Sequence, residues 1–197
     1  MLHSSFVNCH LTAHAHKNEA RLKDWDHLVG TLLFGGSSTL YETSHLFVFG
    51  DLNFRLDIPK DDPIWNRLPV KPPKGKSSTS EPGPATDTTP LLAKEGETLA
   101  QVLSSPALLK ELSAYDQLVQ ARESGRAFRG LEEAPFWAFK CSYKFKIGHV
   151  DKYDTKRMVA WTDRVMWGSF QKLQCLIYTS VPGYTTSDHV GFPIFSW

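Results

Sequence analysis

The chain has few cysteines and no long apolar run, and these two absences exclude several classes of protein. Its three cysteines, Cys9, Cys141 and Cys175, are odd in number and form no CxxC pair. We therefore expect free thiols in a reducing compartment, without a disulfide framework or a structural zinc site. No apolar run approaches the ~18 residues that cross a bilayer. Residues 1–5 lack the basic and apolar segments of a secretory signal. These features predict a cytoplasmic protein that is membrane-associated at most peripherally.

The whole chain also lacks a marked excess of positive or negative charge, but one segment has an excess of positive charge. Lys and Arg number 22 against 21 Asp and Glu, which gives a formal net charge of +1. Between Lys140 and Lys172, however, eight basic residues stand against three Asp and alternate with aromatic residues. This segment predicts a surface for an anionic ligand, and the alternative is a solvated basic face. A phosphoinositide-rich membrane would attract it by about 1 kcal/mol per basic residue.

The length of 197 residues, with 41% hydrophobic residues, predicts one domain, 1–197, with a packed core. Residues 69–97 are different, because they are rich in Pro, Lys, Ser, Thr and Gly and poor in apolar residues. We expect a disordered insertion there, since little apolar burial would offset the entropy cost of ordering it. A regulatory or partner-binding role is the alternative to a neutral insertion.

Apolar periodicity predicts a mixture of helices and strands. Apolar residues at helical spacing, with Gly35 as a stop signal and Ser105-Pro106 as a start signal, predict two helices, over residues 18–34 and 105–125. Short continuous apolar runs predict strands at residues 6–11, 46–49, 136–139, 164–167, 176–178 and 192–195.

Polar residues capable of chemistry follow three of the apolar stretches. Asp51 and Asn53 come where the 46–49 strand ends, two residues apart and so on one side of an extended chain. A carboxylate there can take a proton from water, and an Asn can hold an oxyanion. Asp163 and the Asp188-His189 pair follow later, and Asp-His can bind a phosphoryl oxygen or a metal-bound group. Together these residue types indicate a hydrolase.

The ordered set of motifs resembles the inositol polyphosphate 5-phosphatases of the endonuclease/exonuclease/phosphatase superfamily. Residues 51–56 (DLNFRL) are similar to that family's GDLNYRL, and residues 143–145 (YKF) match the core of its PTYKF. Residues 156–167 (KRMVAWTDRVMW) resemble KKRxPAWCDRxLW, and residues 187–189 form the terminal SDH. Asn8 and His10 match the superfamily's His strand. The resemblance covers nearly the whole chain apart from the 69–97 segment.

The resemblance implies an α/β (α+β) fold, a deoxyribonuclease-I-like four-layer α/β/β/α sandwich. Two strand-end motifs that precede the His strand in the family, one with the Glu that holds magnesium, have no counterpart here. We therefore expect the C-terminal part of the catalytic domain, with the N-terminal part missing and one apolar sheet face uncovered.

The implied activity is magnesium-dependent removal of the 5-phosphate from phosphoinositide lipids or soluble inositol polyphosphates, with no nucleic acid as partner. By resemblance Asp51 is the base, Asn53 aligns the phosphoryl group, and His189 and His10 contact it. Asp163 would support His10, and Asp188 would orient His189 or act as a Mg²⁺ ligand. The residues that would address substrate phosphates are Tyr143, Lys144, Lys156, Arg157, Arg164 and Asn8.

Three departures from the family pattern bear on these roles. Cys141-Ser142 replaces the usual Pro-Thr, Thr162 replaces a Cys, and Val190-Gly191 replaces the Lys-Pro that follows SDH. Without this lysine we expect substrate affinity or specificity to differ from that of the family. Two alternatives therefore stay open: a catalytically dead phosphoinositide-binding module, and a nuclease of the same superfamily.

Overall fold

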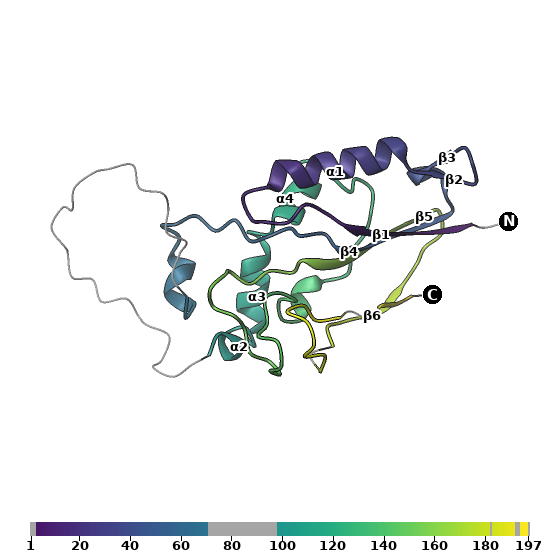
Figure 1. Ribbon diagram of the computed structural model, residues 1–197. Helices are drawn as coiled ribbons and strands as arrows, with labels where there is room; N and C mark the ends of the chain where they lie inside the picture. Colours follow the sequence, from purple (N-terminus) through teal and green to yellow (C-terminus); the bar gives the residue numbers. More distant parts are fainter. Residues whose placement is uncertain (1–2, 71–97, 182, 192–193, 197) are drawn as a thin grey trace, which may run out of the picture.

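The computed structural model describes residues 3–70, 98–181, 183–191 and 194–196, the last group by its backbone alone. The largest sheet within these residues has the strand order β1-β4-β5, formed by β1 (Ser4–His10), β4 (His45–Asp51) and β5 (Asp163–Ser169). β4 pairs in parallel with β1 and antiparallel with β5. The parallel pair needs a crossover, and helix α1 (Asn18–Thr31) supplies it along one face of the sheet (Figure 1).

One face of the sheet is closed by α1 and by α4 (Gln117–Glu123). Every second side chain of β1 is buried, as expected for a strand with one covered face. Leu22 and Trp25 of α1 and Leu118 of α4 share a core cluster with residues from all three strands, namely Val7, Cys9, Leu46, Val48 and Met166. Burial of each large apolar side chain contributes roughly 1.5–3 kcal/mol. The predicted strands at 6–11, 46–49 and 164–167 and the helix at 18–34 are confirmed, although α1 ends at Thr31.

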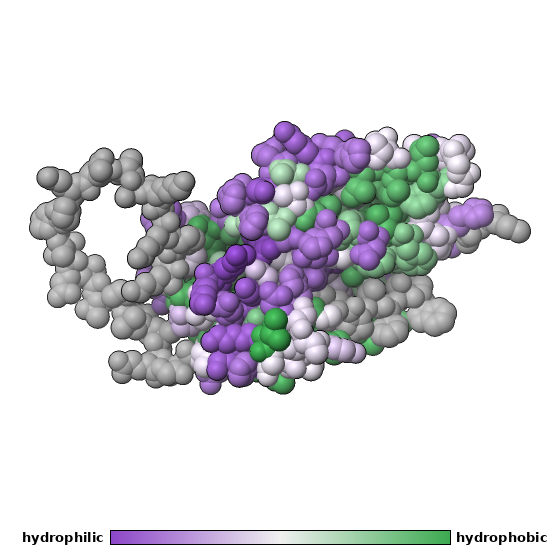
Figure 2. All heavy atoms as spheres, in the orientation of Figure 1, coloured by the Kyte–Doolittle hydropathy of each residue, from purple (hydrophilic) through white to green (hydrophobic). Residues whose placement is uncertain are grey.

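The opposite face of the sheet is partly open. Phe6 stacks on Phe47 with ring centroids 5.1 Å apart, yet Phe6 remains 66% exposed. Trp167 of β5, which pairs with Phe47 of β4, is buried. Figure 2 shows apolar surface gathered at the end of the molecule where β1 begins, and hydrophilic surface where β1 and β4 end. The uncovered apolar face expected from the sequence is therefore present over β1, but not over β5.

A second core lies around the short helices of the middle of the chain. α2 (Leu99–Val102) begins at a capping box formed by Thr98 and Gln101, and α3 (Pro106–Ser113) begins at Ser105, whose hydroxyl accepts from the Leu108 N–H. These helices pack with the 3₁₀ helix η2 (Pro63–Arg67) around Trp161. The predicted N-cap at Ser105 is confirmed.

The single helix predicted over residues 105–125 is wrong, because Asp116 divides it into α3 and α4. The Asp116 carboxylate accepts from the backbone N–H groups of Leu118 and Val119, each at 3.1 Å, and so caps α4. The Gln117 N–H donates to the Arg55 carbonyl instead of continuing a helix. The break therefore comes from contacts with a distant segment, which local periodicity does not report.

The strand predicted at residues 136–139 is also wrong, since Phe136–Ala138 forms the 3₁₀ helix η3. The Phe136 ring packs edge-on against Trp161, with centroids 5.1 Å apart, and the Arg164 guanidinium lies 3.6 Å from its centroid. These tertiary contacts select a turn after Pro135 where the apolar run alone favoured a strand.

The remaining elements are small. β2 (Leu33–Phe34) pairs with β3 (Ser38–Thr39), which leads into the 3₁₀ helix η1 (Leu40–Glu42). β6 (Cys175–Tyr178) pairs with β7 (Ile194–Ser196), so the strand at 176–178 is confirmed. The prediction at 192–195 is confirmed only from Ile194, because residues 192–193 lie outside the described residues. The 71–97 part of the predicted insertion lies outside them as well.

The cysteines agree with the sequence, since all three are free thiols and Cys9 and Cys141 are buried. Burial raises the pKa of the Cys9 thiol to about 11. No helix among the described residues is long and apolar enough to span a membrane.

A buried ion network joins β5 to the helical layer. Arg164 donates to both carboxylate oxygens of Glu133, at 2.6 and 2.7 Å, and to Asp116 at 3.0 Å. The side chains of all three residues are 0–1% exposed. Burial alone lowers the pKa of Arg164, but the charges of Glu133 and Asp116 outweigh it and raise the pKa above its ordinary value. The guanidinium is therefore a structural cation.

We predict that Glu133→Gln costs about 3–5 kcal/mol of unfolding free energy, because it removes the bidentate carboxylate partner of a buried guanidinium and leaves only Asp116 to balance its charge. The matched control is Glu111→Gln, which removes the exposed Arg67–Glu111 pair and should cost at most about 1 kcal/mol. Urea unfolding followed by tryptophan fluorescence measures both. Equal, small losses in the two variants would contradict the structural role of Arg164.

Candidate functional site

Strand pairing brings the candidate residues to one edge of the sheet. His10 pairs with Asp51 in the parallel β1–β4 ladder, and Asp51 pairs with Asp163 in the antiparallel β4–β5 ladder. Paired residues on neighbouring strands point to the same face. Two carboxylates and an imidazole therefore lie side by side where β1 and β4 end.

Gly50 makes this close approach feasible. Its φ of 129° favours glycine, and a Cβ built there would collide with the carbonyl oxygen of Cys9 on the neighbouring strand. Asn8, two residues before His10 on the same face of β1, lies over this glycine. A side chain at residue 50 would push β1 and β4 apart and separate His10 from Asp51.

Asp51 stands at the centre of the site. Its Oδ1 accepts from the Asn53 N–H at 3.0 Å, and its Oδ2 lies 3.4 Å from His10 Nε2 and 3.9 Å from His189 Nε2. Burial and the charge of Asp163 raise the pKa of the Asp51 carboxyl, against the opposing influence of His189, His10 and the Asn53 N–H. A raised pKa brings this carboxylate closer to the range in which it can accept a proton.

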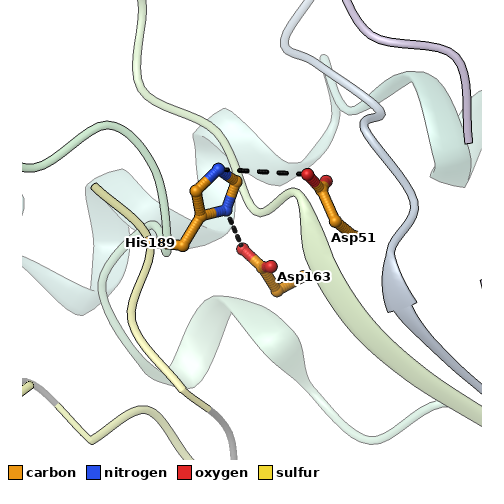
Figure 3. A group of neighbouring side chains, drawn as sticks. All are labelled: Asp51, Asp163 and His189. Atoms are coloured by element: carbon orange, nitrogen blue, oxygen red, sulfur yellow. Dashed lines mark hydrogen bonds and ion pairs between the residues drawn. The ribbon is translucent and has the colours of Figure 1, made fainter. Parts of the chain in front are cut away.

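His189 lies between the two carboxylates (Figure 3). Its Nδ1 is 2.9 Å from Asp163 Oδ2, while its Nε2 faces Asp51. Burial alone lowers the pKa of His189, but the hydrogen bond to Asp163 and the charges of Asp163, Asp51 and Asp188 raise it overall. His189 is thus favoured as an imidazolium that can donate from Nε2 toward a bound anion.

Asn53 is held from beneath the site. It is 1% exposed, adopts a φ of 57°, donates from Nδ2 to the Leu11 carbonyl at 3.0 Å, and accepts at Oδ1 from Arg55. One Nδ2 proton is left by these contacts. The same amide also binds Arg55. The role of Asn53 in aligning a phosphoryl group stays a prediction.

Basic and aromatic side chains adjoin the acidic cluster. The Tyr143 ring centroid lies 4.8 Å from that of His189, and the Arg55 guanidinium lies 4.3 Å from the Tyr143 centroid. Arg157 donates to the Tyr143 hydroxyl at 3.4 Å. Lys144 Nζ lies 3.5 Å from Asp154 and 3.9 Å from Asp188. The predicted Tyr143, Lys144 and Arg157 are therefore close to His189 or to its neighbour Asp188.

A cavity of about 520 Å³ extends from this group. Arg55 and Arg157 line the cavity and also contact Tyr143, so the cavity adjoins the site, although Asp51, Asp163 and His189 do not line it. Its other lining residues include basic and apolar side chains, among them His14, His16, Lys156, Arg157, Trp65 and Met158, together with one acidic residue, Asp57. The sequence predicted Lys156 and Arg157 as ligand-contacting residues but did not single out Arg55, His14 or His16.

Two predicted residues lie elsewhere than expected. Arg164 is 0% exposed and bound to Glu133 and Asp116, so the prediction that it contacts substrate phosphates is wrong. The physical reason is strand alternation, because Asp163 faces the site and its neighbour must then face the core. Asp163 contacts His189, whereas the sequence assigned it to support His10. His10 itself is 74% exposed and keeps its place beside Asp51.

The donor set fits a hard divalent cation. Ligand atoms of Asp51, Asp163 and His189 lie within 4.8 Å of one another. Asp163 Oδ2 is engaged by His189, but Asp51 Oδ2 and Asp163 Oδ1 remain as carboxylate oxygens. Mg²⁺ commonly takes one or two protein carboxylates and completes its shell with water and substrate phosphate. Asp188 lies beside Lys144 and is outside this three-residue group, so its role as a ligand stays a prediction.

Sequence comparison places the chain beside phosphatases. The profile of the endonuclease/exonuclease/phosphatase family 2 matches residues 3–68 and 90–196. Inositol polyphosphate 5-phosphatase K of Mus musculus is 30% identical over 94% of this chain and 36% of its own length. Phosphatidylinositol 3,4,5-trisphosphate 5-phosphatase 1 of Homo sapiens is 27% identical over 97% of this chain and 14% of its own length. The chain thus spans about a third or less of these relatives.

Solved structures share the fold. The inositol polyphosphate 5-phosphatase domain of SPsynaptojanin, in complex with inositol (1,4)-bisphosphate and a calcium ion, matches with a TM-score of 0.69 and 25% identity. That match covers 97% of this chain and 45% of the domain. A Cimex nitrophorin ferrous NO complex matches with a TM-score of 0.57 and 20% identity. This fold therefore occurs with different functions, and the function of this chain has to be argued from its site.

We predict that His189 titrates above its ordinary pKa, and that Asp163→Asn lowers this pKa by removing the anionic partner. NMR titration of the ring protons measures the shift. Because the folded-state pKa is the raised one, protonated His189 stabilises the fold below its unfolded pKa, and this contribution is lost as pH rises through the folded pKa. Asp61→Asn, at an exposed residue, is the control. An unchanged His189 titration in Asp163→Asn would contradict the geometry.

Proposed function

Because the chain belongs to the inositol polyphosphate 5-phosphatase family of the endonuclease/exonuclease/phosphatase superfamily, we propose that it is a magnesium-dependent phosphoric monoester hydrolase. It removes the 5-phosphate of phosphoinositide lipids or soluble inositol polyphosphates. The observation that carries the proposal is the Asp51–His189–Asp163 arrangement beside a basic cavity. The chain spans only part of the length of its relatives, so their activity is a proposal for this chain.

The chain's own groups supply the proton transfers. Asp51 takes a proton from the attacking water, and its raised pKa makes it a better base than an ordinary carboxylate. The water oxygen bonds to phosphorus while the bond from phosphorus to the ring oxygen breaks, and the leaving oxygen takes up a proton from solvent water. Protonated His189 donates from Nε2 to a phosphoryl oxygen, and Asp163 keeps the ring oriented through Nδ1.

A divalent cation, when bound, supplies positive charge to the phosphoryl and leaving oxygens. Asp51 and Asp163 are the residues that would hold it.

Substrate selection is assigned to the basic residues around the cavity. Arg157 and Lys156 line it, and Lys144, which follows Tyr143 in the chain, pairs with Asp154. Arg binds phosphate through two parallel N–H bonds, whereas Lys acts as a point charge. A substrate with several phosphates on one ring would engage both kinds of group. The same positive charge suits contact with an anionic membrane from the cytoplasmic side.

A phosphoinositide-binding module without catalysis is the second candidate. It is favoured by the engagement of Asp163 Oδ2 with His189, which leaves a single oxygen of Asp163 for a metal. Such a module would bind lipid headgroups undiminished and release no phosphate in excess magnesium. A nuclease would instead bind duplex nucleic acid with a strong salt dependence.

We predict that the chain releases phosphate from short-chain phosphatidylinositol 4,5-bisphosphate in the presence of Mg²⁺, and that Asp51→Asn lowers kcat by about 10²–10⁴-fold through loss of the base. A malachite-green phosphate assay with and without EDTA measures this. Asp61→Asn, the same chemical change at an exposed residue, should leave the rate unaltered. Equal rates for the two variants would overturn the role of Asp51.

We also predict that Arg157→Gln raises KM about tenfold with little change in kcat, because a charge-assisted contact to a substrate phosphate is worth roughly 1.5–3 kcal/mol. Arg126→Gln is the matched control, since Arg126 is also exposed and pairs with Glu19 away from the cavity. Steady-state kinetics at two salt concentrations separate the two variants. A kcat loss without a change in KM would show that Arg157 does not bind the ground-state substrate.

A further inference from the structure

Asp163 Oδ2 accepts hydrogen bonds from two hydroxyls in addition to its contact with His189. Besides His189 Nδ1, it accepts from the hydroxyls of Ser142 and Thr162, each at 2.8 Å. Both hydroxyl residues are 0% exposed. The sequence suggested no role for either residue, beyond their being departures from the family motifs.

The direction of the Ser142 bond is fixed by its other partners. Its Oγ accepts from the backbone N–H of Thr162 at 3.1 Å and from that of Asp163 at 3.3 Å. A hydroxyl has two lone pairs and one proton. With both lone pairs engaged, the single proton must be donated, and the Asp163 carboxylate is the acceptor at 2.8 Å.

Thr162 acts on both members of the Asp163–His189 pair. Its hydroxyl donates to Asp163 Oδ2 and lies 3.3 Å from His189 Nδ1. The ring N–H is therefore shared between the Asp163 carboxylate and the Thr162 oxygen.

We propose that the Ser142 and Thr162 hydroxyls are positioning groups that hold Asp163 Oδ2 so that His189 keeps its proton on Nδ1 and turns Nε2 toward Asp51. The proposal rests on the proposed phosphatase function for its catalytic consequence, but not for the geometry. Both residues are 0% exposed, so neither hydroxyl is accessible to a substrate. Their effect passes through Asp163 to His189, whose Nε2 is the atom available to a phosphoryl oxygen.

Paired variants separate hydrogen bonding from packing. Thr162→Val keeps the shape of the side chain and removes the hydroxyl, whereas Thr162→Ser keeps the hydroxyl and leaves a small void. The positioning role requires Thr162→Val to lower kcat about tenfold with KM unchanged. Removal of a group that hydrogen-bonds to and orients a functional side chain in a metal site typically costs about 10–100-fold in activity. Thr162→Ser should retain most of kcat. If Thr162→Ser loses more kcat than Thr162→Val, the loss comes from packing and not from the hydroxyl, and the proposal is overturned. Urea unfolding of both variants shows that each is folded at the assay temperature.

A second readout does not depend on turnover. Long-range ¹H–¹⁵N spectra of the histidine rings, recorded where His189 is neutral and assigned with His189→Gln, report which nitrogen carries the proton. Wild-type protein should show Nδ1–H, and the Ser142→Ala/Thr162→Val double variant should show a mixture with Nε2–H. An unchanged ring signal in the double variant overturns the proposal. If wild-type protein releases no phosphate, the proposed function fails while this spectrum still decides the positioning role.

Discussion

The site depends on the double pairing of β4, which is parallel to β1 and antiparallel to β5. This register places His10, Asp51 and Asp163 in one row at the edge of the sheet, on the face opposite α1. A shift of one residue in either ladder would send one of them to the other face. Gly50 permits the close approach of β1 that the register requires. The chemistry of the site is therefore a consequence of strand pairing.

Successive side chains of β5 point to opposite faces of the sheet, so two adjacent residues have different roles. Asp163 faces the site and accepts from His189, while Arg164 faces the helical layer and binds Glu133 and Asp116. The buried ion network anchors the strand from behind, and the hydroxyls of Ser142 and Thr162 hold Asp163 from beside. The Asp163 carboxylate thus belongs to a strand whose two faces are both tied to the rest of the fold.

The sequence predicted the strands that carry the site because each is a short apolar run with a polar motif within it or at one of its ends. Asp51 and His189 could be found in this way, since each belongs to a motif with a local signature. Arg164 was misassigned because a motif does not say which of two adjacent side chains faces the core. The division of the 105–125 helix at Asp116 was missed because Asp116 caps α4 while it pairs with Arg164, 48 residues away. Ser142 and Thr162 gave no signal, since a hydroxyl acquires its role only when folding brings it to a carboxylate.

The central claim is that water attacks phosphorus at the Asp51–His189–Asp163 site. Phosphate release from an inositol polyphosphate in H₂¹⁸O, analysed by mass spectrometry, tests it most directly. The account predicts released phosphate with one ¹⁸O atom from wild-type protein, and a loss of that product in Asp51→Asn. Release of unlabelled phosphate, or equal labelled release from Asp51→Asn, would contradict it.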